Sequence, residues 1–237
     1  KGGGVPRHCG HLGFGIREFG RLLSGPAYAR RLVTMATGID MRLGETVTGI
    51  EPNGLVEVSS PNGPYTIMAR RIVLATGARE QPRSAKLIGG GRPFGIMTTG
   101  ALQQCAYLHE MAPFQRPLIV GTELVSFSTL LTLRHIGARP AAFLETNSRI
   151  TARRPGDLVA RWIFGTPVLL ETEIVKIAGV RRVEGVTIRQ RGEDRFLVCD
   201  GVVFTGCFLP ETALIRTSHI RMDGGTRGPV IDQHGRT

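Results

Sequence analysis

Residues 72–77 have the sequence Ile-Val-Leu-Ala-Thr-Gly, and residues 201–206 have the related sequence Gly-Val-Val-Phe-Thr-Gly. Each is a short apolar run that ends in a threonine and a glycine. Such runs are typical of strands buried on both faces of a parallel sheet. The terminal glycine lets the backbone turn sharply or approach a ligand closely. We therefore expect two buried strands, each ending at a turn suited to a ligand.

The residues before each run follow the same order, which indicates an internal repeat of long period. In each copy we expect a helix, a three-stranded meander with polar turns, and then the buried strand. The first copy has a helix at 27–35 and strands at 41–50, 55–59 and 65–68. The second copy has a helix at 157–164 and strands at 167–178, 183–189 and 196–199.

A strand–turn–helix–strand unit lies between the two copies. The apolar run at 116–120 is followed by Gly121 and by a helical pattern at 123–135, and a second apolar run covers 141–145. The apolar face of the helix is expected to hold Leu124, Phe127, Leu130 and Leu131. A βαβ unit of this kind is half of a Rossmann-type fold. The predicted fold class is therefore α/β, with two Rossmann-like dinucleotide-binding domains and β-meander crossovers.

The turn of this unit departs from the dinucleotide fingerprint G-x-G-x-x-G. In the window Gly121-Thr-Glu-Leu-Val-Ser126 only the first glycine is present. Glu123 stands where the middle glycine lets the backbone approach the pyrophosphate, and its carboxylate repels a diphosphate there. Gly121 and Glu145 are the candidate binding residues, the second of them for a ribose. We favour a Rossmann-like scaffold that binds no dinucleotide in this half.

The first eleven residues, Lys-Gly-Gly-Gly-Val-Pro-Arg-His-Cys-Gly-His, are rich in glycine. Such a segment is poor material for helices or strands, and it suits a loop that lies against a flat ligand. His8, Cys9 and His11 are an alternative metal-binding set, but their spacing is too close for standard zinc patterns. We therefore assign no metal site. His8, His11 and Glu80 are candidate catalytic bases, and each is equally compatible with a structural role.

The composition is that of a soluble globular protein with an excess of arginine. The 237 residues are 41% hydrophobic and carry a net charge of +11. The arginines are spread along the chain, so nucleic-acid binding ranks last among the hypotheses. No apolar run approaches the roughly 18 residues of a membrane span. The four cysteines form no C-x-x-C pair, which argues against a redox-active dithiol and fits a cytoplasmic protein.

Four stretches together resemble the FAD- and NAD(P)-binding oxidoreductases of the pyridine nucleotide–disulfide reductase superfamily. They are Gly-Gly-x-x-x-x-Cys-x-His-x-Gly-Phe-Gly at 3–15, Gly-Pro-x-Tyr-Ala at 25–29, Ile-Val-Leu-Ala-Thr-Gly-Ala at 72–78 and Arg-Pro-x-Ile-Val-Gly-Thr-Glu-Leu-Val-Ser at 116–126. The resemblance covers essentially the whole chain. It is especially close to relatives of the flavoprotein subunits of amino-acid and opine dehydrogenases.

In that family an FAD domain is interrupted by a second nucleotide domain. The resemblance implies an FAD-binding domain formed by residues 1–92 and 207–237, and a second, NAD(P)-binding-like domain at 93–206. The first βαβ unit with its G-x-G-x-x-G is absent, and so is the Gly-Asp motif after the final hairpin. We therefore expect a fragment that lacks both ends, with an incomplete first domain.

The resemblance also implies which residues contact FAD. A glycine pair is expected near the phosphates and ribityl chain, and an Arg-His-Cys triplet near the isoalloxazine. The backbone of residue 47 is expected at the adenine, and that of residues 75–77 along the cofactor. These residues are Gly3, Gly4, Arg7, His8, Cys9, Val47, Ala75, Thr76 and Gly77. Because positive neighbours lower a thiol pKa, we expect Cys9 to be more reactive than Cys199.

The implied function is that of an FAD-dependent oxidoreductase, either a dehydrogenase or an oxidoreductase subunit, acting on a small organic substrate such as an amine or amino acid. The implied cofactor is FAD, and Glu123 makes NAD(P) use doubtful. Two alternatives stay open. One is an NAD(P)H-dependent flavin reductase. The other is a non-catalytic or electron-relay subunit of a heteromeric dehydrogenase. The missing dithiol argues against disulfide reduction.

Overall fold

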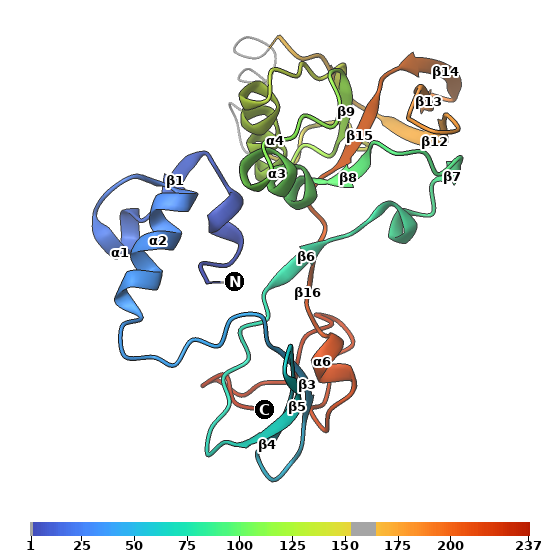
Figure 1. The fold of residues 1–237 in the computed structure, drawn as a ribbon. Coiled ribbons are helices and arrows are strands. Elements are labelled where there is room, and N and C mark those ends of the chain that lie inside the picture. Colours follow the sequence, from blue (N-terminus) through green and yellow to red (C-terminus); the bar gives the residue numbers. More distant parts are fainter. Residues whose placement is uncertain (1, 153–164) are drawn as a thin grey trace. The chain divides into compact units, whose positions relative to one another are not determined.

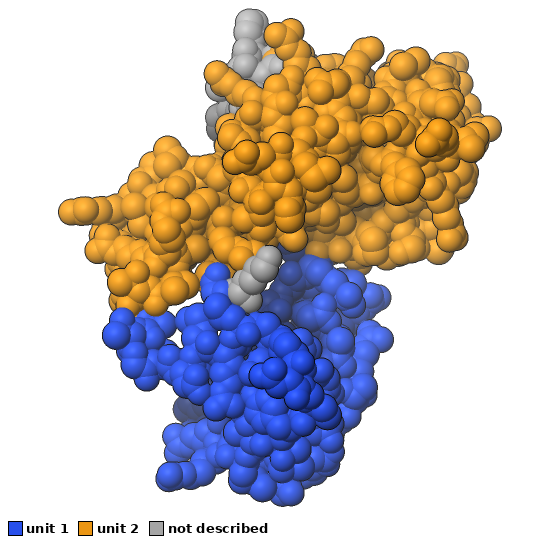
Figure 2. Space-filling model, viewed as in Figure 1, with its two compact units in different colours: residues 1–2, 36–79, 208–237 blue, residues 3–35, 80–207 orange. Residues whose placement is uncertain are grey.

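The computed structural model describes residues 2–152 and 165–237 and divides into two compact units (Figures 1 and 2). The larger unit comprises residues 3–35 and 80–207. The smaller unit comprises residues 1–2, 36–79 and 208–237. The compact units place residues 3–35 and 80–92 with the βαβ segment. The family-type domain boundaries given above stay a prediction.

A five-stranded parallel sheet forms the centre of the larger unit, in the order β11-β10-β9-β15-β8. Its strands are β8 (Ile96–Thr98), β9 (Pro117–Val120), β10 (Ala142–Leu144), β11 (Val168–Leu169) and β15 (Gly201–Phe204). Every residue of β15 is buried, as is typical of a strand with neighbours on both sides and cover on both faces. The prediction of a buried parallel strand at 201–204 is therefore confirmed.

Helices α3 (Thr99–Leu108) and α4 (Leu124–His135) pack against each other and against this sheet (Figure 1). The predicted apolar face of α4 is wrong in part, because Leu124 is 81% exposed and Leu131 is also exposed. The buried face combines Leu130 with small hydroxyl residues, which satisfy their own polar groups by hydrogen bonding. Thr129 and Thr99 of α3, for example, join their hydroxyls at 3.0 Å.

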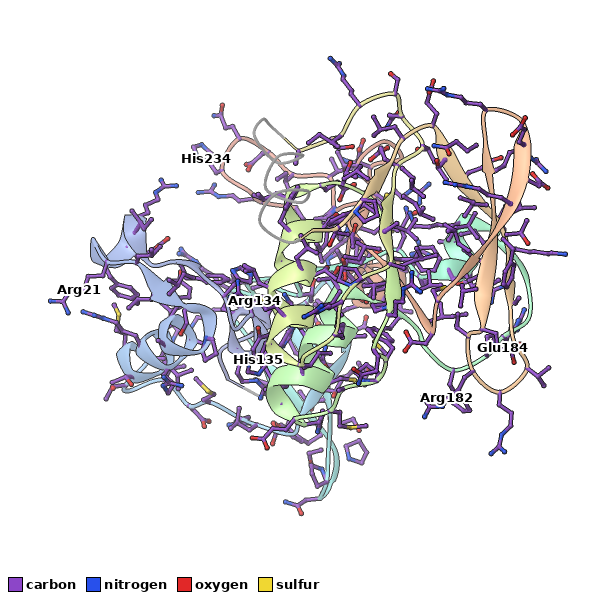
Figure 3. The ribbon with its side chains drawn as sticks, turned by 90° about the horizontal axis from the view of Figure 1, so that it is seen from above. Arg21, Arg134, His135, Arg182, Glu184 and His234 are labelled. Atoms are coloured by element: carbon purple, nitrogen blue, oxygen red, sulfur yellow. The ribbon has the colours of Figure 1, made fainter. Side chains whose placement is uncertain are left out.

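The last turn of α4 carries Arg134 and His135, which are labelled in Figure 3. The positive charge of Arg134 at this end interacts favourably with the helix dipole. The ring of His135 also stacks on Tyr107 of α3 at 4.6 Å between centroids. Gly137, at a φ of 74°, then ends the helical segment, as the sequence predicts.

The second meander forms a four-stranded sheet in the order β14-β13-β12-β7. Its strands are β7 (Gly89–Gly90), β12 (Thr172–Ala178), β13 (Gly185–Gln190) and β14 (Glu193–Val198). The last three are antiparallel and connected in sequence, as predicted for the second copy. The helix predicted at 157–164 lies outside the described residues.

The N-terminal part of the larger unit is built from short elements. They are η1 (Val5–His8), β1 (Leu12–Phe14), α1 (Ile16–Phe19), β2 (Leu23–Ser24) and α2 (Gly25–Met35). The predicted helix at 27–35 is present and begins at Gly25. Gly25 is required there, because a Cβ atom would overlap the carbonyl oxygens of Pro6 and Cys9. The loop that contains η1 therefore lies directly against the start of α2.

The smaller unit contains the first meander, with strands β3 (Thr46–Ile50), β4 (Leu55–Ser60) and β5 (Gly63–Met68), and the short helix α6 (Ala213–Arg216). The prediction of a buried strand at 72–75 is wrong. No strand of the described residues pairs with this segment, and Val73 is 89% exposed. A parallel strand needs ladder partners for its backbone, and without them the apolar sequence alone does not form one.

Three short elements complete the chain: β6 (Ala78–Glu80), which pairs with β16 (Phe208–Pro210), and the 3₁₀-helix η2 (Arg83–Lys86). Of the helices in the described parts of the chain, none combines the length and the apolar character that a membrane crossing requires.

Candidate functional site

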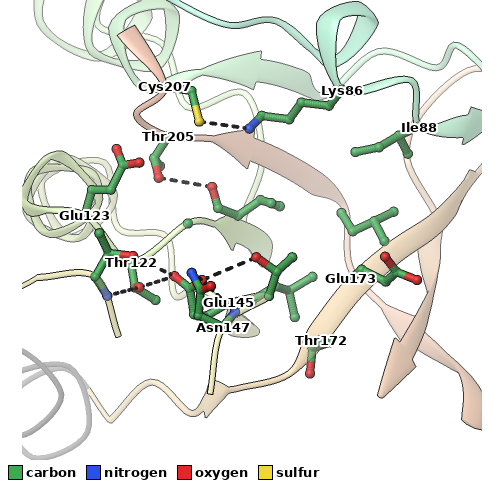
Figure 4. A pocket seen from close by; sticks show the side chains of 16 residues that line it. Lys86, Ile88, Thr122, Glu123, Glu145, Asn147, Thr172, Glu173, Thr205 and Cys207 are labelled. Carbon is green, nitrogen blue, oxygen red and sulfur yellow. Dashed lines mark hydrogen bonds between the residues drawn. The ribbon is translucent and has the colours of Figure 1, made fainter. Parts of the chain in front are cut away.

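A pocket of about 470 Å³ lies where strands β9, β10 and β15 of the larger unit end (Figure 4). Ligands of open α/β sheets bind outside the carboxyl ends of the strands, so this is the expected place for a nucleotide. The residues that follow the three strands all line it: Gly121, Glu145 and Thr205. The structure thus brings together Gly121 and Glu145, the two residues predicted for the second nucleotide site.

The Glu145 carboxylate is buried and accepts hydrogen bonds from its own surroundings. One oxygen accepts from the backbone and side-chain nitrogens of Asn147, at 3.0 and 2.7 Å. The other accepts from the hydroxyls of Thr122 and Thr151. Burial alone would raise the pKa of Glu145, but these hydrogen bonds lower that pKa below its ordinary value. Glu145 is therefore an ionised and fully hydrogen-bonded group.

Glu123 stands immediately before α4, in an extended conformation. Its carboxylate lies over Gly206, the last residue of the second Thr-Gly pair, and a Cβ atom at that position would overlap it. Gly206 has a φ of 69°, and its backbone N–H donates to the buried carboxylate of Glu80 at 3.1 Å. Position 206 therefore accepts Glu123 only because it carries no side chain.

The remaining fingerprint positions keep the helix close to the sheet. Gly121 has a φ of 114°, and a Cβ atom there would overlap the Thr205 hydroxyl. That hydroxyl donates to the carbonyl of Val120 at 3.0 Å and lies 2.6 Å from the hydroxyl of Ser126. Ser126, which replaces the third glycine, thus joins α4 to the end of β15 by a hydrogen bond.

Sequence reasoning missed the opposite wall of this pocket. Lys86 is the last residue of η2, and its ammonium lies 3.5 Å from the Cys207 sulfur (Figure 4). The position of Cys207, directly after the second Thr-Gly, was the available signal. Glu80, one of the candidate bases, accepts hydrogen bonds from the backbone N–H groups of Gly100 and Gly206. These two bonds give Glu80 a structural role.

The N-terminal loop forms a second cluster in the larger unit. Cys9 is 7% exposed, and its sulfur donates to the Gln103 side chain of α3 at 3.3 Å. Burial, with a smaller contribution from Glu80, raises the pKa of Cys9 to about 11. Burial likewise raises the pKa of Cys199 to about 11. The expected lowering of the Cys9 pKa is therefore not found, because burial dominates that pKa. Whether Cys9 reacts faster than Cys199 stays a prediction.

The same loop contains two buried nitrogens, Arg7 Nε and His8 Nδ1, that have no hydrogen-bond partner among residues 2–152 and 165–237. Burial and the charge of Arg7 lower the pKa of His8, so the ring is neutral at pH 7. Gly3 and Gly4 have φ values of 92° and 55°, and a Cβ atom on Gly3 would crowd Ala29 at 3.0 Å. Unsatisfied nitrogens beside exposed glycine backbone fit a ligand rich in acceptors, such as FAD.

The other predicted FAD contacts belong to the smaller unit. Val47 is an exposed residue of β3. The Thr76 hydroxyl donates to the Glu211 carbonyl at 2.9 Å, and the Gly77 carbonyl accepts from the Glu211 N–H at 2.9 Å. Ala75 precedes this pair and is exposed. The predicted contacts thus form two groups, one in each unit, and their role in cofactor binding stays a prediction.

Residues 14–237 match the model of the family described as pyridine nucleotide-disulphide oxidoreductases. The fold is similar to that of the thioredoxin reductase of T. acidophilum, with a TM-score of 0.74 and 18% identity over 99% of this chain and 75% of that one. It is also similar to that of L-proline dehydrogenase of P. horikoshii, with a TM-score of 0.64 and 18% identity over 98% of this chain and 41% of that one. A third similar structure is an NAD-dependent persulfide reductase of A. fulgidus, with a TM-score of 0.64 and 17% identity over 93% of this chain and 41% of that one. A comparison with curated proteins gives no significant match.

Proposed function

The chain belongs to the pyridine nucleotide-disulphide oxidoreductase family, and we propose that it serves an FAD-dependent oxidation of a small organic substrate such as an amine or amino acid. Members of this family are FAD-dependent oxidoreductases. The observation that carries the proposal for this chain is the pair of buried, unpartnered nitrogens of Arg7 and His8 beside Gly3 and Gly4. These atoms are costly in the folded chain unless a ligand supplies their partners.

In this proposal the chain's own residues bind and orient the flavin. Gly3 and Gly4 let the backbone approach the cofactor without a side chain between them. Arg7 and the neutral His8 supply hydrogen bonds to it. FAD, when bound, supplies the hydride acceptor, and the protein supplies binding and electrostatics.

The thiols support a substrate other than a disulfide. All four cysteines are free, and no two form a C-x-x-C pair. Cys9 and Cys199 are buried, and their raised pKa values keep them protonated near neutral pH. A dithiol relay therefore lacks its reactive groups. Four free cysteines also support a reducing, cytoplasmic location as part of the proposal.

A second candidate is a subunit of a heteromeric dehydrogenase. This candidate rests on the resemblance to the flavoprotein subunits of amino-acid and opine dehydrogenases. The two candidates differ in whether the purified protein alone is reduced by substrate.

The test is FAD binding, followed by anaerobic reduction. We expect the protein to bind FAD with quenching of flavin fluorescence, and Arg7→Ala and His8→Ala each to weaken binding about 5–10-fold, as the loss of one hydrogen bond predicts. Arg21→Ala, which removes an exposed arginine of the same segment, is the matched control. Bleaching of the flavin by an amine or amino acid would then identify the substrate class. Protein that binds no FAD would refute the proposal.

A further inference from the structure

We infer that the pocket of the larger unit is closed to NAD(P), the second cofactor that the family implies, and that Thr122 and Glu123 are the residues that determine this specificity. The dinucleotide frame itself is intact. Strand β9, the tight turn at Gly121, helix α4 and strand β10 follow one another as in a dinucleotide-binding unit. What differs is where the side chains of the turn lie.

The first change is at the ribose position. In the fingerprint, the acidic residue after the second strand accepts hydrogen bonds from ribose hydroxyls. Here both oxygens of Glu145 already accept bonds from the chain, two of them from the hydroxyls of Thr122 and Thr151. Thr122 directly follows Gly121, so the turn itself provides the donor that takes the place of the ribose. A ribose would have to displace the bond that this buried hydroxyl donates to Glu145, and the hydroxyl would keep only the bond it accepts from the Thr151 N–H, at 2.9 Å.

The second change is at the diphosphate position. The N-terminus of a helix attracts anions, and the middle glycine normally leaves room for the pyrophosphate there. Glu123, labelled in Figure 4, puts a carboxylate at this end of α4. The carboxylate is folded onto Gly206. The side chain makes no capping hydrogen bond to α4, so its carboxylate adds negative charge beside the place where a diphosphate binds. A diphosphate at the same place would be repelled by the charge of the Glu123 carboxylate and would overlap with its atoms.

The third position shows that the scaffold was kept. The Ser126–Thr205 hydrogen bond holds α4 against β15 as closely as the third glycine of the fingerprint requires. The pocket therefore lost its diphosphate and ribose contacts without losing the fold around them. If the proposed flavin function is correct, reoxidation of the flavin uses an acceptor other than a nicotinamide. The closure itself does not rest on that function.

The test is equilibrium binding of ADP-ribose, NADH and NADPH to the purified protein by calorimetry, with no requirement for bound flavin or activity. We expect no saturable binding below millimolar concentrations for the wild type. Glu123→Gly should tighten ADP-ribose binding at least tenfold, and adding Thr122→Ala should tighten it further by freeing Glu145. Glu173→Gln is the matched control, since it removes a carboxylate that lines the same pocket outside the turn.

Two results would overturn the inference. One is micromolar binding of any of these ligands by the wild type. The other is a Glu123→Gly protein that melts like the wild type and yet binds no more tightly than Glu173→Gln. Should Glu123→Gly fail to fold, Glu123→Gln removes the charge with little change in volume. A gain in ADP-ribose affinity smaller than that of the Glu173→Gln control would then count against the inference.

Discussion

The arrangement of Glu123 over Gly206 predicts a specific cost for a side chain at position 206. Gly206→Ala forces alanine into a left-handed conformation at a φ of 69°, which costs about 1 kcal/mol. The new Cβ atom would also overlap the Glu123 carboxylate, which must move. Glu123 is half-buried and only the end of its flexible side chain is in the way, so moving it adds about 0.5–1 kcal/mol. We therefore expect Gly206→Ala to lower the free energy of unfolding by about 1.5–2 kcal/mol.

The assay is urea unfolding, with Gly137→Ala as the control. Gly137 has a φ of 74° in the same unit, and a Cβ atom there would meet nothing within 4 Å. Gly137→Ala should therefore show the conformational cost alone. The double variant Glu123→Gly/Gly206→Ala should remove the clash, so the two substitutions should be coupled by about 1 kcal/mol.

The reasoning fails under one clear outcome. If Gly206→Ala costs no more than Gly137→Ala, and if the Glu123→Gly substitution does not reduce its cost, then the carboxylate does not lie over Gly206 in solution. The inferred closure of the diphosphate position would lose its geometric basis at the same time.

Three further predictions concern titratable and buried groups. An electrophilic thiol reagent at pH 8 should label the exposed Cys207 before the buried Cys9, because a pKa of about 11 leaves only about one part in a thousand of Cys9 as thiolate. Equal labelling rates of Cys207 and Cys9 in peptide mapping would contradict this. Because the pKa of Glu145 is lower in the folded than in the unfolded chain, its ionised carboxylate stabilises the fold at pH values above the unfolded pKa of about 4.3. This stabilisation is lost as the pH falls through the folded-state pKa. Glu145→Gln should therefore destabilise by about 2 kcal/mol at pH 7, and the difference from wild type should shrink toward pH 3.5. Glu80→Ala leaves two backbone N–H groups without their acceptor and should cost about 2–4 kcal/mol in thermal unfolding, whereas a cost below 1 kcal/mol would argue against both bonds.

The second βαβ unit could be predicted well because each of its parts is encoded locally. Each signal depends only on residues that are close in sequence. These signals are the apolar run before Gly121, the helical pattern after it and the helix end at Gly137. The same logic failed at residues 72–75, because a parallel strand depends on partners elsewhere in the chain. It also failed for the outward-facing Leu124, because polar residues such as Thr129 fill the buried face through hydrogen bonds that a hydrophobic pattern does not represent.

The candidate site shows the same limit at the level of single groups. The sequence is enough to assign Glu123 to the diphosphate position of the fingerprint, since that position is counted from Gly121. It could not show that the Thr122 hydroxyl donates a hydrogen bond to the Glu145 carboxylate, or that the Glu123 carboxylate lies over Gly206. Both are contacts between segments that follow different strands. For Cys9 the flanking charges were visible in the sequence, whereas burial, the larger influence on its pKa, was not.

The contact between Glu123 and Gly206 also restricts the order in which these two positions can change during evolution. The glutamate at 123 can keep its present position only while 206 is a glycine, so a side chain that arises at 206 before the glutamate is replaced lowers the stability of the fold. Replacement of Glu123 by glycine has no such precondition. Descendants of this sequence can therefore regain an open turn in one step, whereas those that first acquire a side chain at 206 must pass through a less stable intermediate.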